Sequence, residues 1–454
     1  MVFNSVEFLL GFLPIFIILY YITPGNYRNI TLLIGSIFFY AYGEPRYVLL
    51  LIISVVVNYT AGKSIDREKQ ISHKKRRAIY VIMVAVDVLV LAFFKWEFCL
   101  PFSPEKLTLP LGISFYTFQI ISYLTDVYRG EISAENSMIR LGTYISMFPQ
   151  LVAGPIVKYS EVSDDLKNRS YQLKNVDKGL KNFVWGLSMK VLLADRLSLL
   201  WNEMQTVGFI SISTPLAWMG AFSYSMQIYF DFYGYSLMAV GLGQMLGFSL
   251  PENFNLPYMA KSVREFYRRW HITLGRWFKN YVYIPLGGSR KGICKTILNL
   301  LIVWVLTSFW HGGSINFLLW GMSLWLLIVL ERLLDKKEML SRSKVLSRLY
   351  VIIVIPLTWM CFAIPDISDL STYFGRMLGF VSAVNVNIGD FAKVFSNYGF
   401  LFIIGIIMCT PLSKKIFEKF KDKLPGMLVL GVLFWLCIWR IMAEGNNPFM
   451  YFRF

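Results

Sequence analysis

Two of the chain's three histidines lie in short stretches that are rich in aromatic and basic residues. His271 closes the run REFYRRWH at 264–271, and His311 stands within FWHGG at 309–313. His311 therefore lies at the end of a long apolar stretch, directly before a glycine break. An ionisable side chain at membrane depth costs free energy to place, and such residues usually have a function. Both histidines are therefore candidates for a functional site.

The composition places these histidines in a membrane protein. Hydrophobic residues make up 56% of the 454 residues, aromatic residues 17% and charged residues 16%, whereas about 25% of an average soluble domain is charged. Many apolar runs approach the roughly 20 residues that cross a bilayer. We predict an all-α polytopic integral membrane protein, with residues 1–454 forming one membrane domain. The first apolar run, 6–22, has no basic start or cleavage site typical of a signal peptide, so we expect it to remain.

The net charge of +17 is concentrated in short segments between the apolar runs. Seven Lys or Arg residues lie in 63–77, nine in 261–295, six in 332–348 and five in 411–423. Cytoplasmic loops carry such an excess of basic residues. We therefore place these segments inside the cell, in a multi-pass protein of the cytoplasmic (inner) membrane, where they contact anionic lipid rather than nucleic acid. Residues 366–397 hold two basic and three acidic residues and are placed outside.

Thirteen apolar segments are candidate spans, and several are short or interrupted by glycine or proline. They cover residues 6–22, 27–43, 47–62, 78–96, 109–125, 139–155, 183–200, 215–247, 296–310, 314–331, 349–365, 397–412 and 425–441. Because 97–108 falls outside and the basic loop 158–181 inside, only one of 109–125 and 139–155 can cross fully. The second contains PQLVAGP at 149–155, where proline prevents an unbroken helix. We expect it to enter the membrane, return, and line an internal site.

Residues 263–279 are too charged to span lipid, yet their pattern is helical. Arg264, Arg268 and His271 recur on one helical face, and aromatic residues recur on another. One interpretation is an amphipathic helix that anchors the protein on the inner leaflet. The other is a re-entrant helix whose polar side chains face a cavity. The second gains support from the PLGGSR loop at 285–290, in which glycine lets the backbone approach a ligand closely.

The loop charges also predict that the segments containing the two histidines begin on different sides of the membrane. Residues 261–295 are inside, so the span 296–310 runs outward and places His311 near its outer end. The span 314–331 then returns to the inner loop. His271 starts from the cytoplasmic side. If the two histidines act in one site, that site must be a tunnel or funnel through the protein.

The cysteines indicate no further chemistry. Five are scattered along the chain without a CxxC pair, so the sequence predicts neither a disulfide framework nor a zinc site. With three widely spaced histidines, no metal cluster is expected.

Several motifs make the sequence resemble the membrane-bound O-acyltransferases, and within them the bacterial alginate O-acetylation branch. They are REFYRRWHITL at 264–274 with WFKNYVYIPLGGS at 277–289, FPQLVAGP at 148–155, TSFWHGG at 307–313 and NPFMYFRF at 447–454. They are long and occur in order along nearly the whole chain. The resemblance implies a ring of about 11–13 transmembrane or re-entrant helices around a central funnel. In such a funnel the acyl donor enters from the cytoplasm, and the acyl group leaves toward the outside.

The resemblance also implies roles for the two histidines, within a catalytic core at 261–313. The most constant histidine of the family corresponds to His311, and its second polar position corresponds to His271. Transfer of an acyl group from a thioester to a hydroxyl requires that the hydroxyl lose its proton as it attacks. A histidine is well suited to this, so His311 is the candidate general base. His271 is a candidate for orienting the thioester, stabilising developing charge or fixing the re-entrant helix.

The acyl donor is expected to be a substrate, either acetyl-CoA or an acyl carrier, and no bound cofactor is expected. Arg264, Arg268 and Arg269 are candidates for holding its phosphates, because arginine pairs well with phosphate. Asn316, five residues after His311, is a candidate for orienting that histidine. No GxSxG elbow or Ser-His-Asp arrangement is visible, so a covalent acyl-enzyme has no support in the sequence.

The function expected from the resemblance is O-acetylation of an extracellular or cell-wall polysaccharide. In this branch an extracytoplasmic hydrolase-like acetyltransferase often receives the acyl group and passes it to the polymer. One alternative is D-alanyl transfer to teichoic acid, although the PLGG at 285–288 resembles the acetylation branch more closely. Another is a non-enzymatic transporter or exporter, which would depend on the intramembrane acids Asp87 and Asp231 rather than on His311.

Overall fold

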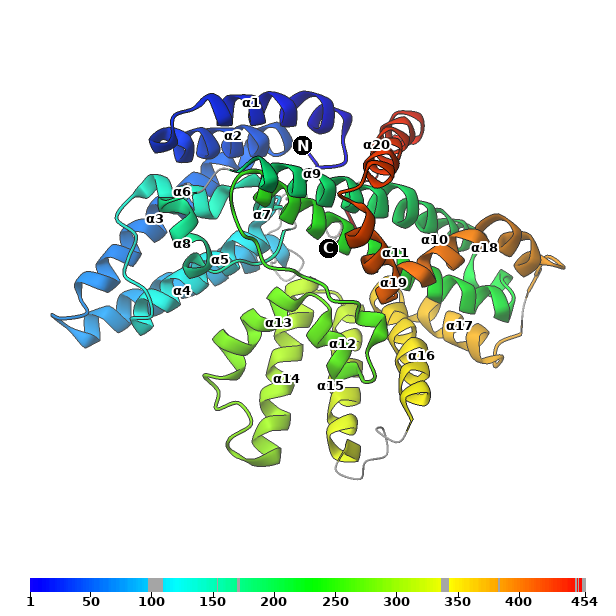
Figure 1. Cartoon of the computed structure of the whole chain (residues 1–454). Coiled ribbons are helices and arrows are strands. Elements are labelled where there is room, and N and C mark those ends of the chain that lie inside the picture. The colour runs from blue at the N-terminus through cyan, green and yellow to red at the C-terminus, as the bar shows by residue number, and fades with distance from the viewer. Residues whose placement is uncertain are drawn as a thin grey trace.

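The computed structural model describes residues 1–96, 109–152, 154–169, 172–335, 343–382, 384–445, 447 and 449–450. All regular structure in this part of the chain is helical (Figure 1). Seven of the described helices are long and apolar enough to cross a membrane. They are α3 (Val48–Arg67), α4 (His73–Lys95), α14 (Gly292–His311), α15 (Ile315–Asp335), α16 (Lys344–Ala363), α18 (Asp390–Met408) and α20 (Leu424–Glu444). The predicted all-α polytopic membrane fold is confirmed.

The remaining described α-helices are shorter or lie mostly inside the protein. They are α1 (Leu13–Ile22), α2 (Arg28–Gly43), α5 (Ile113–Arg129), α6 (Met138–Ser146), α7 (Phe148–Leu151), α8 (Tyr159–Lys167), α9 (Leu173–Ser188), α10 (Asp195–Val207), α11 (Thr214–Met245), α12 (Val263–Arg269), α13 (Ile272–Phe278), α17 (Ile367–Leu378) and α19 (Pro411–Phe420). The predicted loop 97–108, Ala153 and most of the motif 447–454 lie outside the described residues.

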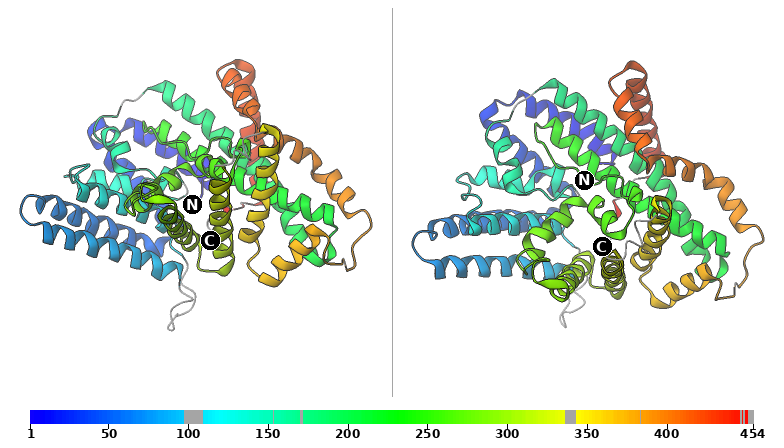
Figure 2. Two further views of the ribbon diagram at one scale, coloured as in Figure 1. Left: turned by 90° about the horizontal axis from the view of Figure 1, so that it is seen from below. Right: turned by 60° about the horizontal axis from the view of Figure 1, so that its bottom comes forward.

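The helices are arranged around a central group formed by α9, α10 and α11. Figure 1 shows α1 and α2 on one side of this group and α12 to α16 on the other. Seen from below, the α3–α4 pair projects at one end of the molecule and α17–α18 lie at the other, with α12 to α15 between them (Figure 2). Both histidine segments therefore belong to the group between these two ends.

Helices α9 and α11 approach each other through paired glycines. A Cβ atom on Gly179 would lie 2.5 Å from the carbonyl oxygen of Gly241, and one on Gly186 would lie 2.5 Å from that of Gly234. Lipid tails are as apolar as leucine, so membrane helices associate largely through close packing of small residues. These four glycines let the backbones of α9 and α11 touch, and this contact fixes the position of α11 beside the site described below.

The predicted span 183–200 is part of a longer helical run. α9 continues through the π-helical segment Met189–Ala194 into α10. Lys190 of that segment is buried and lies 2.6 Å from a carboxylate oxygen of Asp195 and 2.7 Å from one of Asp231. A buried charge is tolerated only when it is paired and hydrogen-bonded. This ion-pair cluster therefore joins α10 and α11 beside the π-helical segment.

The segment predicted to enter the membrane and return is broken as expected. α6 ends at Ser146, and the four-residue helix α7 follows after Met147, which has extended ψ. The tip of the segment touches the start of α5, because a Cβ atom on Gly112 would lie 2.3 Å from the Leu151 carbonyl oxygen. Gly112 also has φ of +73°, a conformation that favours glycine.

This contact defines how far the segment reaches. The far end of α5 lies beside the start of α4, which is predicted to be cytoplasmic, and there the Arg76 guanidinium donates to the Val127 carbonyl at 3.2 Å. Gly112 lies at the opposite end of α5. The segment from α6 to α8 thus extends toward the end of α5 that the loop charges predict to be the outer one.

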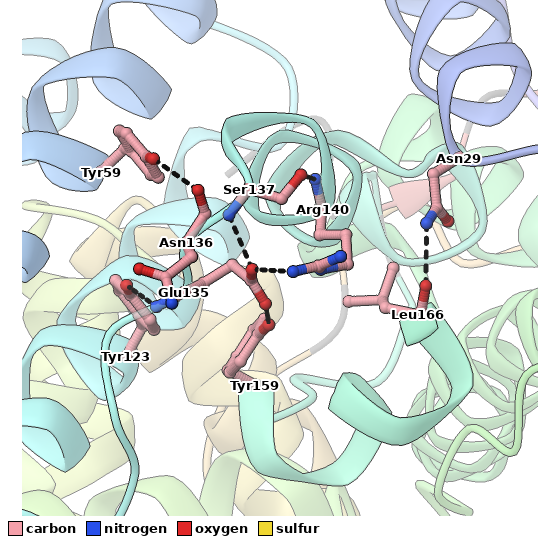
Figure 3. A network of polar contacts seen from close by, with 9 residues as sticks. All are labelled: Asn29, Tyr59, Tyr123, Glu135, Asn136, Ser137, Arg140, Tyr159 and Leu166. Carbon is pink, nitrogen blue, oxygen red and sulfur yellow. Dashed lines mark hydrogen bonds and ion pairs between the residues drawn. The ribbon is translucent and has the colours of Figure 1, made fainter. Parts of the chain in front are cut away.

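A buried carboxylate holds the two legs of this re-entrant segment together (Figure 3). Glu135, before α6, accepts hydrogen bonds from the Ser137 N–H at 2.7 Å and from Arg140 of α6 at 2.6 Å. It also accepts one from the hydroxyl of Tyr159 in α8. Its own N–H donates to the Tyr123 hydroxyl of α5 at 3.0 Å. Because a buried carboxylate needs such partners, this network fixes α6 and α8 against α5.

Candidate active site

His311 is the last residue of α14 and is enclosed by aromatic rings. Only 4% of the His311 surface is exposed. The ring centroid lies 5.0 Å from that of Trp320 in α15, 5.2 Å from that of Phe362 in α16 and 6.3 Å from that of Phe317. Aromatic walls of this kind keep water away and fix the orientation of a side chain. The histidine is thus held in a defined position at the end of a membrane helix.

Gly312 lets the chain leave α14 without disturbing this enclosure. A Cβ atom at this position would lie 2.5 Å from the ring of Phe317, which itself packs against Phe362 at 4.9 Å between centroids. A larger residue would therefore push Phe317 away from His311. The glycine break that the sequence indicated is needed because an aromatic ring occupies the space of the missing side chain.

His271 lies at the break between α12 and α13, and a side-chain amide fixes its tautomer. The Asn253 amide oxygen accepts the Thr273 N–H at 3.2 Å and the Thr273 hydroxyl at 2.9 Å, and lies 3.0 Å from His271 Nδ1. An amide oxygen can only accept. His271 Nδ1 must therefore carry the proton, and the lone pair lies on Nε2.

The same hydrogen bonds connect His271 to the re-entrant segment. The Thr273 hydroxyl, which donates to Asn253, also accepts the N–H of Ile156 at 3.0 Å. All three of these residues are buried or nearly so. The backbone that follows α7 is thus bonded to the start of α13, and both share the amide that holds His271. Movement of the re-entrant segment would be transmitted directly to this histidine.

The two histidines come together around one indole ring. The Trp310 ring centroid lies 4.7 Å from that of His311 and 6.1 Å from that of His271. The indole also lies parallel to Phe118 of α5, at 5.6 Å, and Phe118 stacks on Trp277 at 4.0 Å. The structure therefore brings His271 and His311 into one site, although the loop charges predict that their segments start from opposite sides of the membrane.

A cavity of about 250 Å³ opens beside His311. Its wall includes His311 and Trp310 from α14, Lys95 from the end of α4, Gly112 from the start of α5 and Val152 from the re-entrant segment. The charge distribution predicts that the ends of α4 and α14 and the start of α5 face the outside. The prediction that the re-entrant segment lines an internal site is confirmed by Val152. His271 is not part of this wall, although its ring also lies beside Trp310.

Arg264 is engaged within the protein. Its Nε lies 3.5 Å from a carboxylate oxygen of Glu331 in α15, a residue that is 1% exposed. Glu331 also accepts two backbone N–H groups at the start of α12. A buried carboxylate in this position stabilises the helix start through the helix dipole. Arg264 therefore neutralises Glu331 and fixes α12 to α15, in addition to any contact with a donor.

The other two arginines have different surroundings. Arg269 forms an ion pair with Glu265 at 2.7 Å on the same helix. Although burial alone would raise it, the pKa of Glu265 is held below its usual value by the Lys261 N–H and by Arg269. Arg268 is exposed and forms no ion pair with any residue in the described part of the chain. Of the three predicted donor-binding residues, Arg268 is the one whose guanidinium is not already used by a carboxylate.

The prediction that Arg264, Arg268 and His271 share one helical face is wrong. α12 ends at Arg269, Trp270 is extended, and His271 has φ of +41° at the start of α13. The break arises because residues 253–255 pair with the chain here through two backbone hydrogen bonds. The aromatic residues of this segment are buried, including Phe266 at 0% and Trp270 at 4% exposed. They pack inside the protein, which argues against a simple anchor on the inner leaflet.

Asn316 does not contact His311 in the way the sequence suggested. Its amide oxygen accepts the Ser314 hydroxyl at 2.6 Å, and its amide nitrogen donates to the Phe362 carbonyl at 3.0 Å. Phe362 in turn packs against His311. Asn316 therefore supports the aromatic wall around the histidine and has no direct bond to it.

Three polar residues of the site were not identified from the sequence. Asn253 and Thr273 hold His271, and Lys95 lines the cavity beside His311. Asn253 lies in an irregular segment with no periodic pattern, and a lysine at the end of an apolar run is usually an interfacial residue. Of the three, only Lys95 could have been suspected from the sequence, because it is an ionisable residue within a predicted span.

Comparison with known proteins identifies the family. Residues 131–368, which include both histidines, match the model of the membrane-bound O-acyltransferase family. A probable alginate O-acetylase from Pseudomonas putida is 35% identical over 394 residues, covering 84% of this chain and 81% of that protein. A peptidoglycan O-acetyltransferase from Helicobacter pylori is 31% identical over 526 residues, covering 100% and 98%. A teichoic acid D-alanyltransferase from Bacillus subtilis is 26% identical over 230 residues, covering 48% and 58%.

The family match covers the segments that contain both histidines, and the Helicobacter pylori protein aligns with the whole chain. The all-helical membrane fold and the enclosed pair of imidazoles agree with them. The chain belongs to the membrane-bound O-acyltransferase family and is an O-acyltransferase.

Proposed function

We propose that this enzyme takes an acetyl group from a cytoplasmic thioester and delivers it for O-acetylation of an extracellular or cell-wall polysaccharide. The observation that carries the proposal is the position of His311. It is buried at the end of α14, borders a cavity whose wall includes Lys95, and shares the indole of Trp310 with His271 at the break between α12 and α13. In this proposal the acceptor reaches His311 through the cavity, and the donor reaches the site from the side of His271.

In the proposed reaction His311 acts as general base. The acceptor hydroxyl enters the cavity and gives its proton to the imidazole as its oxygen attacks the thioester carbonyl. The carbon–sulfur bond then breaks, and the thiolate takes the proton from the imidazolium. A positioned base of this kind contributes about 10²- to 10⁴-fold to the rate. His271, with its lone pair on Nε2, is proposed to orient the donor beside Trp310.

The donor is proposed to be acetyl-CoA or an acyl carrier, both of which present phosphate groups. Arg268 is exposed on the cytoplasmic face of α12 and is not engaged by a carboxylate among the described residues. Its guanidinium suits bidentate recognition of phosphate. Residues 261–313 thus form the proposed catalytic core, with donor recognition at one end and the base at the other.

Acetyl transfer is favoured over D-alanyl transfer by the relatives. The two O-acetyltransferases cover most or all of this chain at 31–35% identity, whereas the D-alanyltransferase covers about half at 26%. The transporter alternative has little support. Asp231 forms an ion pair with Lys190, and Asp87 accepts the Asn58 amide at 3.0 Å, so both acids have partners within the protein. The acceptor polymer is proposed to be reached through an extracytoplasmic hydrolase-like acetyltransferase.

The test is the amount of ester-bound acetate on the host's surface polymers. Peptidoglycan and exopolysaccharide are isolated separately from wild type, a deletion strain, and the deletion strain complemented with the His311→Ala protein. Acetate is released by mild alkali, and D-alanine is measured in the same extracts. Membrane abundance of the variant is matched to wild type by immunoblot.

Loss of acetate from one polymer in both mutant strains is the expected result, and the polymer affected identifies the acceptor. Loss of D-alanine with unchanged acetate would indicate that the enzyme transfers D-alanine instead of acetate. Unchanged acetate and D-alanine in both strains would contradict the proposed function.

A further inference from the structure

Lys95 is an unusual residue for the end of a membrane helix. Its ammonium donates to the carbonyl of Trp310 and lies 5.3 Å from the centre of the Trp310 ring. It also forms part of the cavity wall that includes His311. The lysine and the candidate base are 216 positions apart in the sequence, yet they border the same space, and Trp310 contacts both.

No carboxylate neutralises this ammonium among the described residues. The cavity wall also contains Glu44, but no ion pair joins Glu44 or any other described acid to Lys95. A cation that is partly removed from water without a partner costs free energy. Membrane proteins retain such ionisable residues where they have a function.

Part of the role of Lys95 is structural. The last carbonyl groups of a helix have no partner within it, and cations near a helix C-terminus stabilise it. Lys95 supplies a donor to the Trp310 carbonyl, and the neighbouring Trp96 indole N–H donates to the Phe309 carbonyl at 3.2 Å. Lys95, the last residue of α4, and Trp96, which follows it, thus cap the end of α14. Capping requires a donor but not a full positive charge, as Trp96 demonstrates.

We infer that the charge of Lys95 has a second role, as a catalytic residue that stabilises the oxyanion formed during acyl transfer. This inference rests on the proposed function. When the acceptor oxygen bonds to the thioester carbon, negative charge develops on the carbonyl oxygen. It disappears when the carbon–sulfur bond breaks. An ammonium on the wall of the same cavity as His311 is in the right region to interact with this charge, while His311 holds the proton from the acceptor.

Three substitutions separate charge from capping. Lys95→Gln retains a hydrogen-bond donor for the Trp310 carbonyl but removes the charge. Lys95→Arg retains the charge. Trp96→Phe removes the neighbouring cap and leaves the charge intact. Each variant and His311→Ala is expressed in the deletion strain at matched membrane abundance. Cells are pulse-labelled with radioactive acetate, and the initial rate of ester-bound label appearing on the polymer is measured, together with the thermal stability of the purified protein in detergent.

The loss of one preorganised oxyanion donor lowers a rate by about 10²- to 10³-fold, so Lys95→Gln is expected to lose about 10²-fold. Trp96→Phe is expected to stay within about threefold of wild type, because it removes one neutral hydrogen bond to the Phe309 carbonyl and leaves the ammonium of Lys95 in place. Lys95→Arg is expected to be more active than Lys95→Gln at similar thermal stability. Capping alone would not explain why Lys95→Gln is slower than both Lys95→Arg and Trp96→Phe.

If Lys95→Gln acetylates as fast as Trp96→Phe while His311→Ala is inactive, the role of Lys95 is refuted and the proposed function stands. If His311→Ala is as active as wild type, the proposed function itself fails. Should Lys95→Gln be absent from the membrane, Lys95→Asn, which also keeps an amide donor without the charge, replaces it in cells grown at lower temperature, again against Trp96→Phe.

Discussion

Gly112 offers a direct test of the contact between the re-entrant segment and the catalytic cavity. It has φ of +73°, and a Cβ atom would lie 2.3 Å from the Leu151 carbonyl oxygen. Ordinary contacts of a Cβ atom begin at 3.4 Å, so Leu151 would have to retreat by 3.4 − 2.3 = 1.1 Å in Gly112→Ala. Gly379 provides a matched control, because it has φ of +76° and no atom within 4 Å of the added Cβ.

The two substitutions share one cost and differ in the other. The left-handed conformation costs an L-residue about 1–2 kcal/mol, and both variants incur it. Overpacking costs about 1–3 kcal/mol more, and only Gly112→Ala incurs it. We expect Gly112→Ala to unfold at a clearly lower temperature than Gly379→Ala when both proteins are purified in the same detergent and followed by size exclusion after heating.

Activity should follow the same order. Gly112, Val152 and His311 share the cavity wall, so displacement of the re-entrant segment changes the space in which the acceptor is expected to bind. Ester-bound acetate should fall in Gly112→Ala at matched abundance and remain near wild type in Gly379→Ala. Equal losses of stability in the two variants would refute the tight contact at Leu151. Full activity of Gly112→Ala would show that the segment does not shape the site.

The other predictions concern the two ends of the site. Asn253→Ala leaves the buried donors of His271 and Thr273 without the Asn253 acceptor, at about 1–3 kcal/mol each. Both thermal stability and acetylation should therefore fall. A fully active variant would exclude the Asn253 amide as the group that orients His271. His271→Ala should lower acetylation strongly at unchanged membrane abundance, and wild-type rates would assign His271 a purely structural position. Arg264→Ala should act mainly on stability, by about 1–3 kcal/mol, because it leaves the carboxylate of Glu331 uncompensated. Arg268→Ala should lower the acetylation rate at unchanged stability, measured at matched abundance. If instead Arg268→Ala lowered stability and Arg264→Ala lowered only the rate, the assignment of Arg264 to Glu331 and of Arg268 to the donor would be contradicted.

The amino-acid sequence determined the class of the protein and predicted its orientation. Long apolar runs require helices that satisfy their own backbone hydrogen bonds in lipid, and the basic loops predict which ends are inside. Prolines at 149 and 155 predicted the broken re-entrant segment, and the position of His311 before Gly312 indicated a functional residue at a helix end. These features depend on composition and on neighbours along the chain, so they can be read without a fold.

The tertiary structure decided which polar groups act together. His271 leaves the helical face of Arg264 because a distant segment that includes Asn253 pairs with the chain at that point. Arg264 is engaged by Glu331, 67 positions away, and Lys95 reaches the Trp310 carbonyl from a helix 215 positions earlier. Such contacts are set by how helices pack, and a local pattern contains no information about which distant residue will lie opposite. The sequence therefore predicted the candidate base, while the residues that hold and complement it became evident only from the packing of α4, α5 and the re-entrant segments around α14.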